Sequence, residues 1–329
     1  MTGSVAAVVV TYNRKYLLIE CLDALLMQTA NLDRVYVIDN ASTDGTSELL
    51  RTNGYLANER IEYIKMPYNT GGAGGFHEGI RRAHVAGFGW IWIMDDDAEP
   101  ASEALSLLRQ TFRSEVAAVA SLTVGRDGNP QYKHRGWFNF SRKDDGIIDP
   151  INEGDIEADE LPVNFASFVG LAINRAAIEK IGYPKKEFFI HYDDNEYCIR
   201  LSSFGPIILS PRSVIKHKDQ AHSESQSRHR RILGRTSERV PLEKLWITYF
   251  GLRNRIWLKS ENASFIDSFL YSVRWFSRKC VGILLYDDHK YIRMRFFWNA
   301  IYDGLSGNFD NDKPKRLLMI RPVTAIRRS

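Results

Sequence analysis

The sequence predicts an α/β fold with a mainly parallel sheet and helices on both of its faces. Short apolar runs rich in β-branched residues alternate with segments whose apolar residues recur at helical spacing. This β–α alternation is typical of parallel strands, which are buried on both faces. Acidic residues, asparagine and glycine follow several of the apolar runs, and an α/β sheet binds its ligands beyond such strand ends.

Each element is assigned from its own pattern. Apolar runs predict strands at residues 5–10, 34–39, 61–66, 90–94, 116–122, 165–173, 207–210 and 214–217. Helical spacing and polar capping residues predict helices at residues 16–28, 42–53, 76–86, 101–112 and 194–204. Residues 125–162 are polar and rich in Gly, Asp and Asn, which predicts an excursion beside the active site with room for a hairpin.

The last third of the chain differs from the first two thirds. A polar, basic connection (SESQSRHRR) is predicted to be a mobile loop. Amphipathic helices are then predicted at residues 242–259, 266–285 and 291–305. We therefore expect two regions: a catalytic α/β domain over residues 1–223 and a basic helical region over residues 224–329.

Composition excludes several classes of protein. The 329 residues are 44% hydrophobic and 26% charged, which is ordinary for a globular protein. Three scattered cysteines give no disulfide framework and suggest a reducing compartment. The first residues lack the basic start of a signal peptide. The longest apolar segment, residues 265–286, is interrupted by four charges, whereas a spanning helix needs about 18 uncharged residues. A secreted scaffold, a disordered chain and an integral membrane protein are not expected.

Charge is distributed unevenly. Residues 225–329 hold 21 Lys and Arg against 9 Asp and Glu, a net of +12, which leaves −8 for the first 224 residues. Basic residues interleaved with Trp, Tyr and Phe favour an anionic lipid surface. A plain solvated helical surface is the simpler alternative. Nucleic acid is not expected as a partner. The aromatic residues of these predicted helices could pack against a second subunit as readily as against lipid, so a homo-oligomer remains an alternative.

An acidic triplet, Asp95, Asp96 and Asp97, follows the predicted strand at residues 90–94. Three adjacent carboxylates repel one another unless a cation joins them. Oxygen ligands suit Mg²⁺ or Mn²⁺ carrying a diphosphate. The alternatives are a solvated turn or a helix cap. His217 ends another strand, where a histidine is usually structural, but beside a bound cation its imidazole would be a further ligand.

Polar residues after the first three strands are candidates for binding a nucleotide. A strand-end carboxylate, Asp39, can accept hydrogen bonds from a uracil imide or a ribose hydroxyl, whereas its neighbours can cap a helix. The glycine-rich segment 69–76 is predicted to be a loop that allows close backbone approach to an anion. It matches neither GxGxxG nor a P-loop. The candidates are Thr11, Asn13, Arg14, Asp39, Asn69, Gly71, Gly72, Asp95 and Asp96.

A second acidic cluster starts the predicted helix at residues 194–204. A carboxylate at a helix N-terminus stays ionised and can accept a proton from an attacking hydroxyl, which makes Asp194 the candidate base. Asp193 is the alternative base, and either residue could instead cap the helix.

Taken together, five segments resemble the inverting glycosyltransferase family 2, whose fold is called GT-A. They are VVVTYNR, VIDNASTDGT, YNTGGAGGF, WIWIMDDDA and FFIHYDDNEYCIRL, in that order over residues 5–217. The resemblance implies that Asp39 contacts the nucleotide and that Asp95–Asp97, with His217, hold the metal and the diphosphate. It also implies that Asp194, supported by Glu196, is the base.

Two branches of the family look similar to this chain. The GGAGGF, DDD and aromatic-Asp-Asp segments resemble bacterial galactofuranosyltransferases, and the DNASTDGT and FFI…C-I-R segments resemble rhamnosyltransferases. The first branch implies transfer of galactofuranose from UDP-galactofuranose to a glycan or polyprenyl-linked glycan in cell-surface polysaccharide synthesis. The second implies dTDP-rhamnose as the donor. The acceptor candidates are Trp137, Phe168 and His191, with core packing as the alternative for the two aromatic residues.

The cysteine count and the basic, aromatic last third together predict a cellular location. We expect a cytoplasmic enzyme, peripheral on the inner face of the cytoplasmic membrane. The rival interpretations are an inactive nucleotide-sugar-binding protein and a nucleotidyltransferase. The first needs a missing base or metal ligand, whereas both acidic clusters are intact. The second needs a basic, glycine-rich signature near the first strand, which TYNRK lacks.

Overall fold

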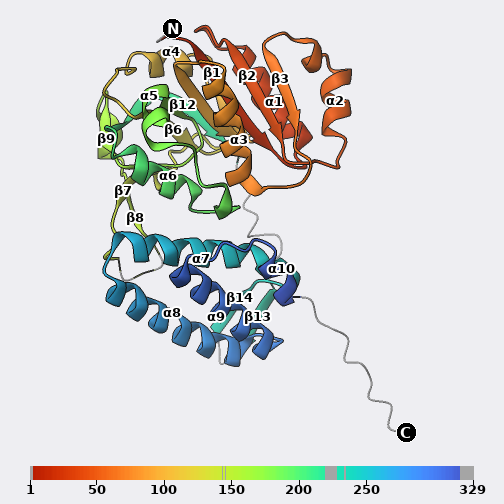
Figure 1. The fold of residues 1–329 in the computed structure, drawn as a ribbon, viewed down its shortest axis with the longest axis vertical. Helices are drawn as coiled ribbons and strands as arrows, with labels where there is room; N and C mark the ends of the chain where they lie inside the picture. Colours follow the sequence, from red (N-terminus) through yellow and green to blue (C-terminus); the bar gives the residue numbers. More distant parts are fainter. Residues whose placement is uncertain (1–2, 143, 145, 219–227, 233–234, 319–329) are drawn as a thin grey trace. The chain divides into compact units, whose positions relative to one another are not determined.

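The computed structural model describes residues 3–142, 144, 146–218, 228–232 and 235–318. The chain divides into two compact units, residues 1–220 and 221–329 (Figure 1). Each unit is described by itself below. The roles expected for the two regions stay predictions.

The first unit is built on a nine-stranded sheet. Its order is β3-β2-β1-β4-β11-β6-β12-β5, and β9 pairs with β12. The strands are β1 Val5–Thr11, β2 Arg34–Asp39, β3 Ile61–Lys65, β4 Trp90–Asp95, β5 Ala98–Pro100, β6 Ala118–Val124, β9 Leu161–Val163, β11 Leu171–Asn174 and β12 Ile207–His217. β1 to β4 are mutually parallel, and β11 enters antiparallel between β4 and β6. The predicted α/β class is confirmed, with a mixed sheet.

Helices cover both faces of this sheet, as predicted. Alternate residues of β1 point to opposite sides, so Val8 packs with α3, whereas Val9 packs with α1. α3, α5 and α6 contribute to the first core, and α1, α2 and α4 contribute to the second. The helices are α1 Lys15–Leu26, α2 Thr46–Thr52, α3 Gly71–Val85, α4 Ala104–Arg109, α5 Arg175–Ile181 and α6 Asp193–Leu201.

The excursion after β6 contains the expected hairpin. β7 Arg135–Phe138 pairs antiparallel with β8 Ile148–Pro150, and β10 Phe165–Ala166 adds a third strand. The predicted strand at residues 165–173 is therefore two strands, β10 and β11. Conversely, the two strands predicted at residues 207–217 are one strand, β12, with an irregularity between Ser210 and Val214.

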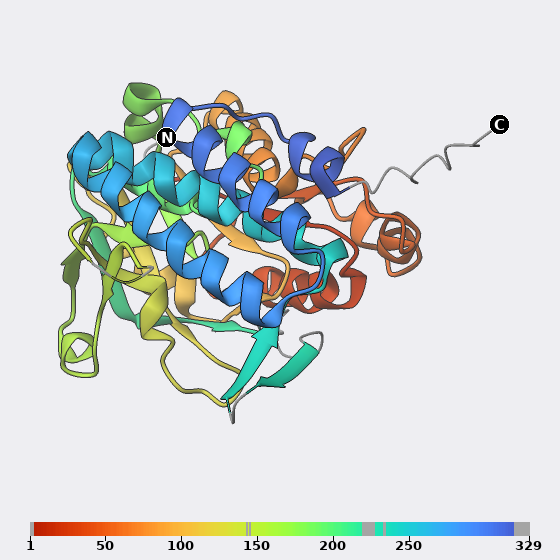
Figure 2. The ribbon, with the colours of Figure 1, turned by 90° about the horizontal axis from the view of Figure 1, so that it is seen from below.

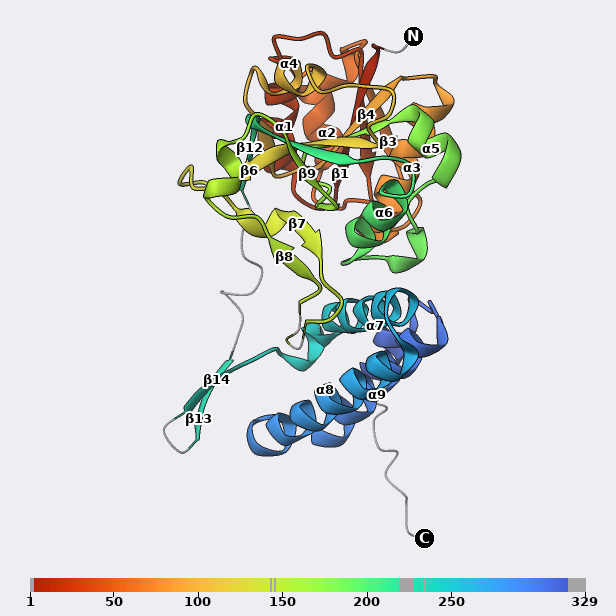
Figure 3. The ribbon, with the colours of Figure 1, turned by 90° about the vertical axis from the view of Figure 1, so that its left-hand side faces the viewer.

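The second unit is mainly helical. Its helices are α7 Leu245–Asn262, α8 Phe265–Tyr286, α9 Lys290–Ser306 and α10 Lys313–Leu318, and two short strands, β13 Arg228–Ile232 and β14 Arg235–Arg239, pair antiparallel. The three predicted amphipathic helices are thus present, and α7, α8 and α9 pack together (Figures 2 and 3). Their core includes Tyr249, Ile256, Ile283 and Phe296. Residues 223–227 of the predicted mobile loop lie outside the described residues, and its last four residues, 228–231, belong to strand β13 instead.

Helix length and apolarity bear on membrane insertion. Among the residues that the structure describes, no helix is long and apolar enough to cross a membrane.

Candidate active site

The strand ends bring the predicted residues together. β1 lies between β2 and β4 with all three strands parallel, so Thr11 is level with Asp39, and Val10 is level with Asp95. The carboxyl ends of the three strands therefore form one edge. His217 reaches the same region from the end of β12.

Three of the predicted metal ligands form a cluster. Ligand atoms of Asp95, Asp97 and His217 all lie within 4.8 Å of one another. The Oδ1 atom of Asp97 lies 3.3 Å from Nε2 of His217, but it has no hydrogen bond within the described part of the chain. A buried carboxylate oxygen without a hydrogen bond is costly, and a cation would satisfy it. The donor set of two carboxylates and one imidazole fits Mn²⁺ or Mg²⁺.

The local electrostatics agree with a cation site. Burial and the neighbouring Asp97 raise the pKa of Asp95 to about 7, and burial raises the pKa of Asp96 to about 6. Burial also opposes ionisation of Asp97, but His217 and Arg14 outweigh it and lower the pKa of that carboxyl. Concentrated, desolvated negative charge of this kind is what a divalent cation offsets.

Arg14 already neutralises part of the triplet. Its Nη1 atom lies 3.2 Å from Oδ1 of Asp96 and 2.7 Å from Oδ2 of Asp97. The hydroxyl of Thr11 donates to the other Asp96 oxygen at 2.7 Å. Asp96 thus ties the end of β1 to the triplet, whereas Asp95 and Asp97 line the cavity described below.

The predicted nucleotide-binding residues hold the strand-end loops in place. Asp39 is fully buried and accepts hydrogen bonds from the backbone N–H of Ser42 and the hydroxyl of Tyr63. The Oδ1 atom of Asn13 accepts from the backbone N–H of Thr43 at 2.7 Å. These bonds fix the loop between β2 and α2 against the end of β1. Contact of these residues with a nucleotide stays a prediction.

The glycines from Gly71 onward are the start of α3, so the prediction of a loop over residues 69–76 is wrong from residue 71. Asn69 accepts from the backbone N–H of Gly71, where the helix begins. Gly71 has a φ of +72°, and a Cβ there would lie 2.0 Å from the carbonyl oxygen of Phe189. A Cβ on Gly75 would meet Val10 at 2.5 Å. These two glycines serve close packing, whereas Gly72 has open space and lines the cavity.

The second acidic cluster starts α6 after an unusual backbone segment. Phe189, His191 and Tyr192 all have φ between +64° and +66°, a region that non-glycine residues rarely adopt. This segment turns the chain so that Asp193 and Asp194 occupy the first turn of α6. Three such residues in a stretch of four are a strained arrangement of the kind found at functional sites.

The two aspartates have different protonation tendencies. Burial raises the pKa of Asp194 to about 6, while the backbone N–H of Asn195 and the charge of Arg135 favour its ionised form. Burial and the neighbouring Asp194 raise the pKa of Asp193 well above its ordinary value. At neutral pH, Asp194 is therefore the ionised member of the pair and has the proton affinity that a general base needs.

Glu196 has a structural environment. Its two carboxylate oxygens accept from Nε and Nη2 of Arg200 at 2.8 and 2.7 Å. Arg200 also donates to the carbonyl oxygens of Ile181 and Tyr183. Glu196 thereby anchors α6 to the end of α5, and it does not line the cavity.

One cavity of about 680 Å³ joins the two acidic clusters. Its lining includes nine of the predicted residues: Arg14, Gly72, Asp95, Asp97, Phe168, His191, Asp193, Asp194 and His217. Trp137 is not part of it, because its indole N–H donates to the carbonyl oxygen of Pro162. The candidate base and the candidate cation-binding cluster therefore line the same cavity.

Lys133, His134 and Ser167 are polar residues of this cavity that lie outside every motif of the sequence analysis. The Nδ1 atom of His134 lies 2.9 Å from the Ser167 hydroxyl, and its ring packs edge-on against His217 at 5.1 Å. Burial lowers the pKa of His134 to about 2, so this imidazole is neutral. The only sequence signal was their position in or next to the predicted excursion, which carries no motif.

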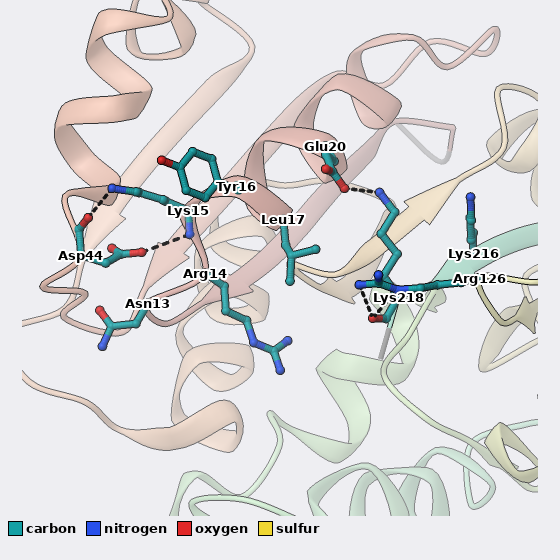
Figure 4. Close-up of a pocket in the computed structure, with 10 residues that line it drawn as sticks. All are labelled: Asn13, Arg14, Lys15, Tyr16, Leu17, Glu20, Asp44, Arg126, Lys216 and Lys218. Atoms are coloured by element: carbon teal, nitrogen blue, oxygen red, sulfur yellow. Dashed lines mark hydrogen bonds and ion pairs between the residues drawn. The ribbon is translucent and has the colours of Figure 1, made fainter. Parts of the chain in front are cut away.

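A second hollow of about 730 Å³ lies beside the N-terminus of α1 (Figure 4). Five basic residues line it, but most already have partners. Lys15 donates to the carbonyl oxygen of Asp44, Lys218 pairs with Glu20, and Arg126 donates to the carbonyl oxygen of Lys218. These interactions hold the surface of the first unit together.

The sheet, the acidic strand end and the carboxylate at the start of a helix define a glycosyltransferase of the GT-A kind. Residues 6–182 match the model for glycosyl transferase family 2, so the chain belongs to that family. The predicted family and fold are confirmed.

Individual relatives refine this picture. The chain is 30% identical over 213 residues to the galactofuranosyltransferase GlfT1 of Mycolicibacterium smegmatis, which covers 62% of this chain and 67% of that protein. It is 25% identical over 217 residues to the dTDP-rhamnosyl transferase RfbF of Shigella flexneri, covering 63% and 66%. The matches thus span about two thirds of these relatives.

A solved structure shows the same fold. The mannosyltransferase PcManGT from Pyrobaculum calidifontis, in complex with GDP-Man and Mn²⁺, aligns with a TM-score of 0.53 at 18% identity. The alignment covers 79% of this chain and 65% of that one.

Proposed function

We propose that this protein is a metal-dependent, inverting glycosyltransferase that transfers galactofuranose from UDP-galactofuranose. The acceptor is a glycan or polyprenyl-linked glycan in cell-surface polysaccharide synthesis. The observation that carries the proposal is the shared cavity, in which Asp194 faces the same space as Asp95, Asp97 and His217. The similarity to GlfT1, which is named as a galactofuranosyltransferase, supports the choice of sugar.

The residues of the cavity divide the reaction between them. Asp95, Asp97 and His217 would hold Mn²⁺ or Mg²⁺, and the cation would offset the charge of a leaving nucleoside diphosphate. Arg14 adds a fixed positive charge on the same side. Asp194 accepts the proton of the acceptor hydroxyl, whose oxygen attacks the anomeric carbon from the face opposite the diphosphate. Such a single displacement inverts the anomeric configuration.

The remaining residues position the two substrates. Thr11, Asn13, Asp39 and Asn69 shape the strand-end loops on the nucleotide side. Phe168 and His191 line the cavity and would contact the acceptor. We place the enzyme in the cytoplasm, at the inner face of the cytoplasmic membrane, where a polyprenyl-linked acceptor would be exposed.

A donor panel tests the proposal. Purified full-length protein would be incubated with Mn²⁺ or Mg²⁺, a polyprenyl-linked glycan and one radiolabelled donor at a time. We expect transfer from UDP-galactofuranose and none from its ring isomer UDP-galactopyranose, which is the matched control. NMR of the product would show an inverted anomeric centre. Diphosphate release without sugar transfer, or full activity in excess chelator, would contradict the proposal.

The second candidate is a rhamnosyltransferase that uses dTDP-rhamnose. The similarity to RfbF favours it, at lower identity than the similarity to GlfT1. In the same panel, transfer from dTDP-rhamnose alone would select this candidate. Donor binding without transfer from any donor would instead indicate a nucleotide-sugar-binding protein.

A further inference from the structure

Helix α8 exposes a long apolar face. One side of the 22-residue helix packs on α7 and α9 and buries Ser268, Ser272 and Ile283. The other side carries large apolar residues whose exposed fractions are 47–67%: Ile266, Phe269, Leu270, Val273, Val281, Leu284 and Leu285. Most of them recur every three or four residues, so they form a stripe along the helix. An exposed stripe of this size marks an interaction surface.

The stripe continues onto α9 through an aromatic pair. The ring of Phe276 packs against Trp298 with centroids 5.4 Å apart. Trp298 is 55% exposed, and Tyr291 and Tyr302 lie seven residues before it and four residues after it on the same side of α9. Tryptophan and tyrosine have an apolar ring with one polar atom, which suits the boundary between water and lipid.

Basic side chains surround this face. Arg274 and Arg278 on α8 and Arg295 on α9 are exposed. Asp267 is an exposed acid on α8, and Asp288, which follows the helix, pairs with Arg293. Since residues 225–329 carry a net charge of +12, a second copy of the chain would bring like charges together at this face. An anionic lipid surface offers opposite charge and accepts apolar side chains.

We propose that the apolar stripe of α8, with the adjoining edge of α9, docks the protein on an anionic phospholipid bilayer. The helix lies in the plane of the headgroups, its apolar residues enter the boundary of the acyl chains, and the arginines contact lipid phosphates. The inference goes beyond the proposed transfer reaction and does not depend on it. It gives that reaction a lipid surface on which a polyprenyl-linked acceptor resides.

Vesicle co-sedimentation of the full-length protein tests the proposal. The probes are vesicles of phosphatidylglycerol mixed with phosphatidylcholine, and vesicles of phosphatidylcholine alone. We expect binding to the anionic vesicles that weakens as salt rises. The double variant Leu270→Gln/Leu284→Gln should weaken binding by at least about 10-fold, because two partly exposed apolar side chains lose their lipid contact. Val85→Gln, at a 70% exposed position of α3, is the matched control.

A second variant separates charge from apolar contact. Arg274→Gln/Arg278→Gln should weaken binding to anionic vesicles by about 30-fold, since each basic residue near such a surface contributes about 1 kcal/mol. Arg212→Gln, at an exposed position of β12, is its control. Circular dichroism and thermal unfolding check that each variant is folded.

Three results would overturn the proposal. They are equal binding to both kinds of vesicle, no binding at low salt, and unchanged binding of both double variants. Analytical ultracentrifugation can give a fourth such result. If Leu270→Gln/Leu284→Gln converts a dimer to a monomer without weakening vesicle binding, the stripe is an interface between two copies of the chain. Because no step measures sugar transfer, an inactive protein that binds vesicles would refute the proposed function and leave this inference standing.

Discussion

Replacing Asp194 with asparagine should sharply lower turnover and stabilise the fold at the same time. The side chain is half-buried, and desolvation raises the pKa of its carboxyl from the ordinary value of 3.8 to about 6. The folded state therefore binds the proton more tightly than the unfolded state. The cost of keeping Asp194 ionised is absent below pH 3.8, grows as the pH rises, and is complete above pH 6. This difference corresponds to about 3 kcal/mol.

Asparagine has nearly the same shape and no charge to desolvate. Its side-chain oxygen can still accept from the backbone N–H of residue 195, which bonds Oδ1 of Asp194 at 2.8 Å. At pH 7, Asp194→Asn should therefore raise the free energy of unfolding by up to about 3 kcal/mol. Loss of the general base should lower turnover by about 10²–10⁴-fold. When an active-site residue lowers the stability of the fold, its replacement commonly raises stability and lowers activity together.

Asp193→Asn is the matched control, because burial and Asp194 keep that neighbouring carboxyl protonated. Replacing a neutral acid by a neutral amide should change turnover by less than about 10-fold. The assays are urea unfolding at pH 7 and initial rates of sugar transfer with saturating metal, which holds the metal-binding carboxylates ionised. Turnover of the wild-type protein should fall about tenfold per pH unit below pH 6. Turnover of Asp194→Asn should not show this decrease.

The reasoning fails if Asp194→Asn keeps near-normal turnover, in which case Asp193 becomes the candidate base. It also fails if Asp194→Asn destabilises the protein at pH 7 while Asp193→Asn does not.

Three other predictions concern the metal cluster, the start of α3 and the buried Arg135. Calorimetry with MnCl₂ should detect metal binding to wild-type protein and none to Asp97→Ala or His217→Ala; retained affinity in both variants would place the metal elsewhere. Gly71→Ala should lower the free energy of unfolding by at least about 1–2 kcal/mol, because alanine is strained at this left-handed φ. The loss should be larger still, because the added Cβ would lie 2.0 Å from the carbonyl oxygen of Phe189. Gly72→Ala, which meets nothing within 4 Å, should raise stability by up to about 1 kcal/mol in the same urea titration, and equal effects would refute the packing argument. Arg135→Met should destabilise by about 3 kcal/mol or more, because it removes the donors to the carbonyl oxygens of residues 121, 134 and 169. An unchanged urea midpoint would show that water replaces those donors.

The sequence predicted the sheet well because its strands are apolar on both faces. β1 is buried at every position, and such a run has few alternatives to a central strand. The antiparallel pairing of β11 was not predictable, because the apolar pattern of residues 165–173 contains no information on strand direction. The glycines at the start of α3 were mistaken for a loop because propensity disfavours glycine in a helix. Here packing against Val10 and Phe189 outweighs propensity.

The candidate site also contains some residues that the sequence could predict and others that it could not. The acidic residues Asp95, Asp97 and Asp194 were predictable because strand ends and helix starts have strong sequence signals. His134 was not, because it comes from the excursion after β6, where no periodic pattern exists and a contact with Ser167 depends on tertiary structure. The pairing of Arg14 with Asp96 and Asp97 likewise joins residues more than 80 positions apart.

The contact between Gly71 and Phe189 has a consequence for redesigning specificity. The backbone N–H of Ala73 donates to the Phe189 carbonyl at 3.1 Å, so the segment before Asp194 is held against α3. The facing wall, with His134 and Ser167, belongs to a separate stretch of chain between β6 and β11. A chimera that exchanges this stretch as one block, with Arg135 included, would alter this part of the cavity lining and keep the host's geometry around Asp194. The stretch between β6 and β11 is therefore a unit that can be exchanged between relatives.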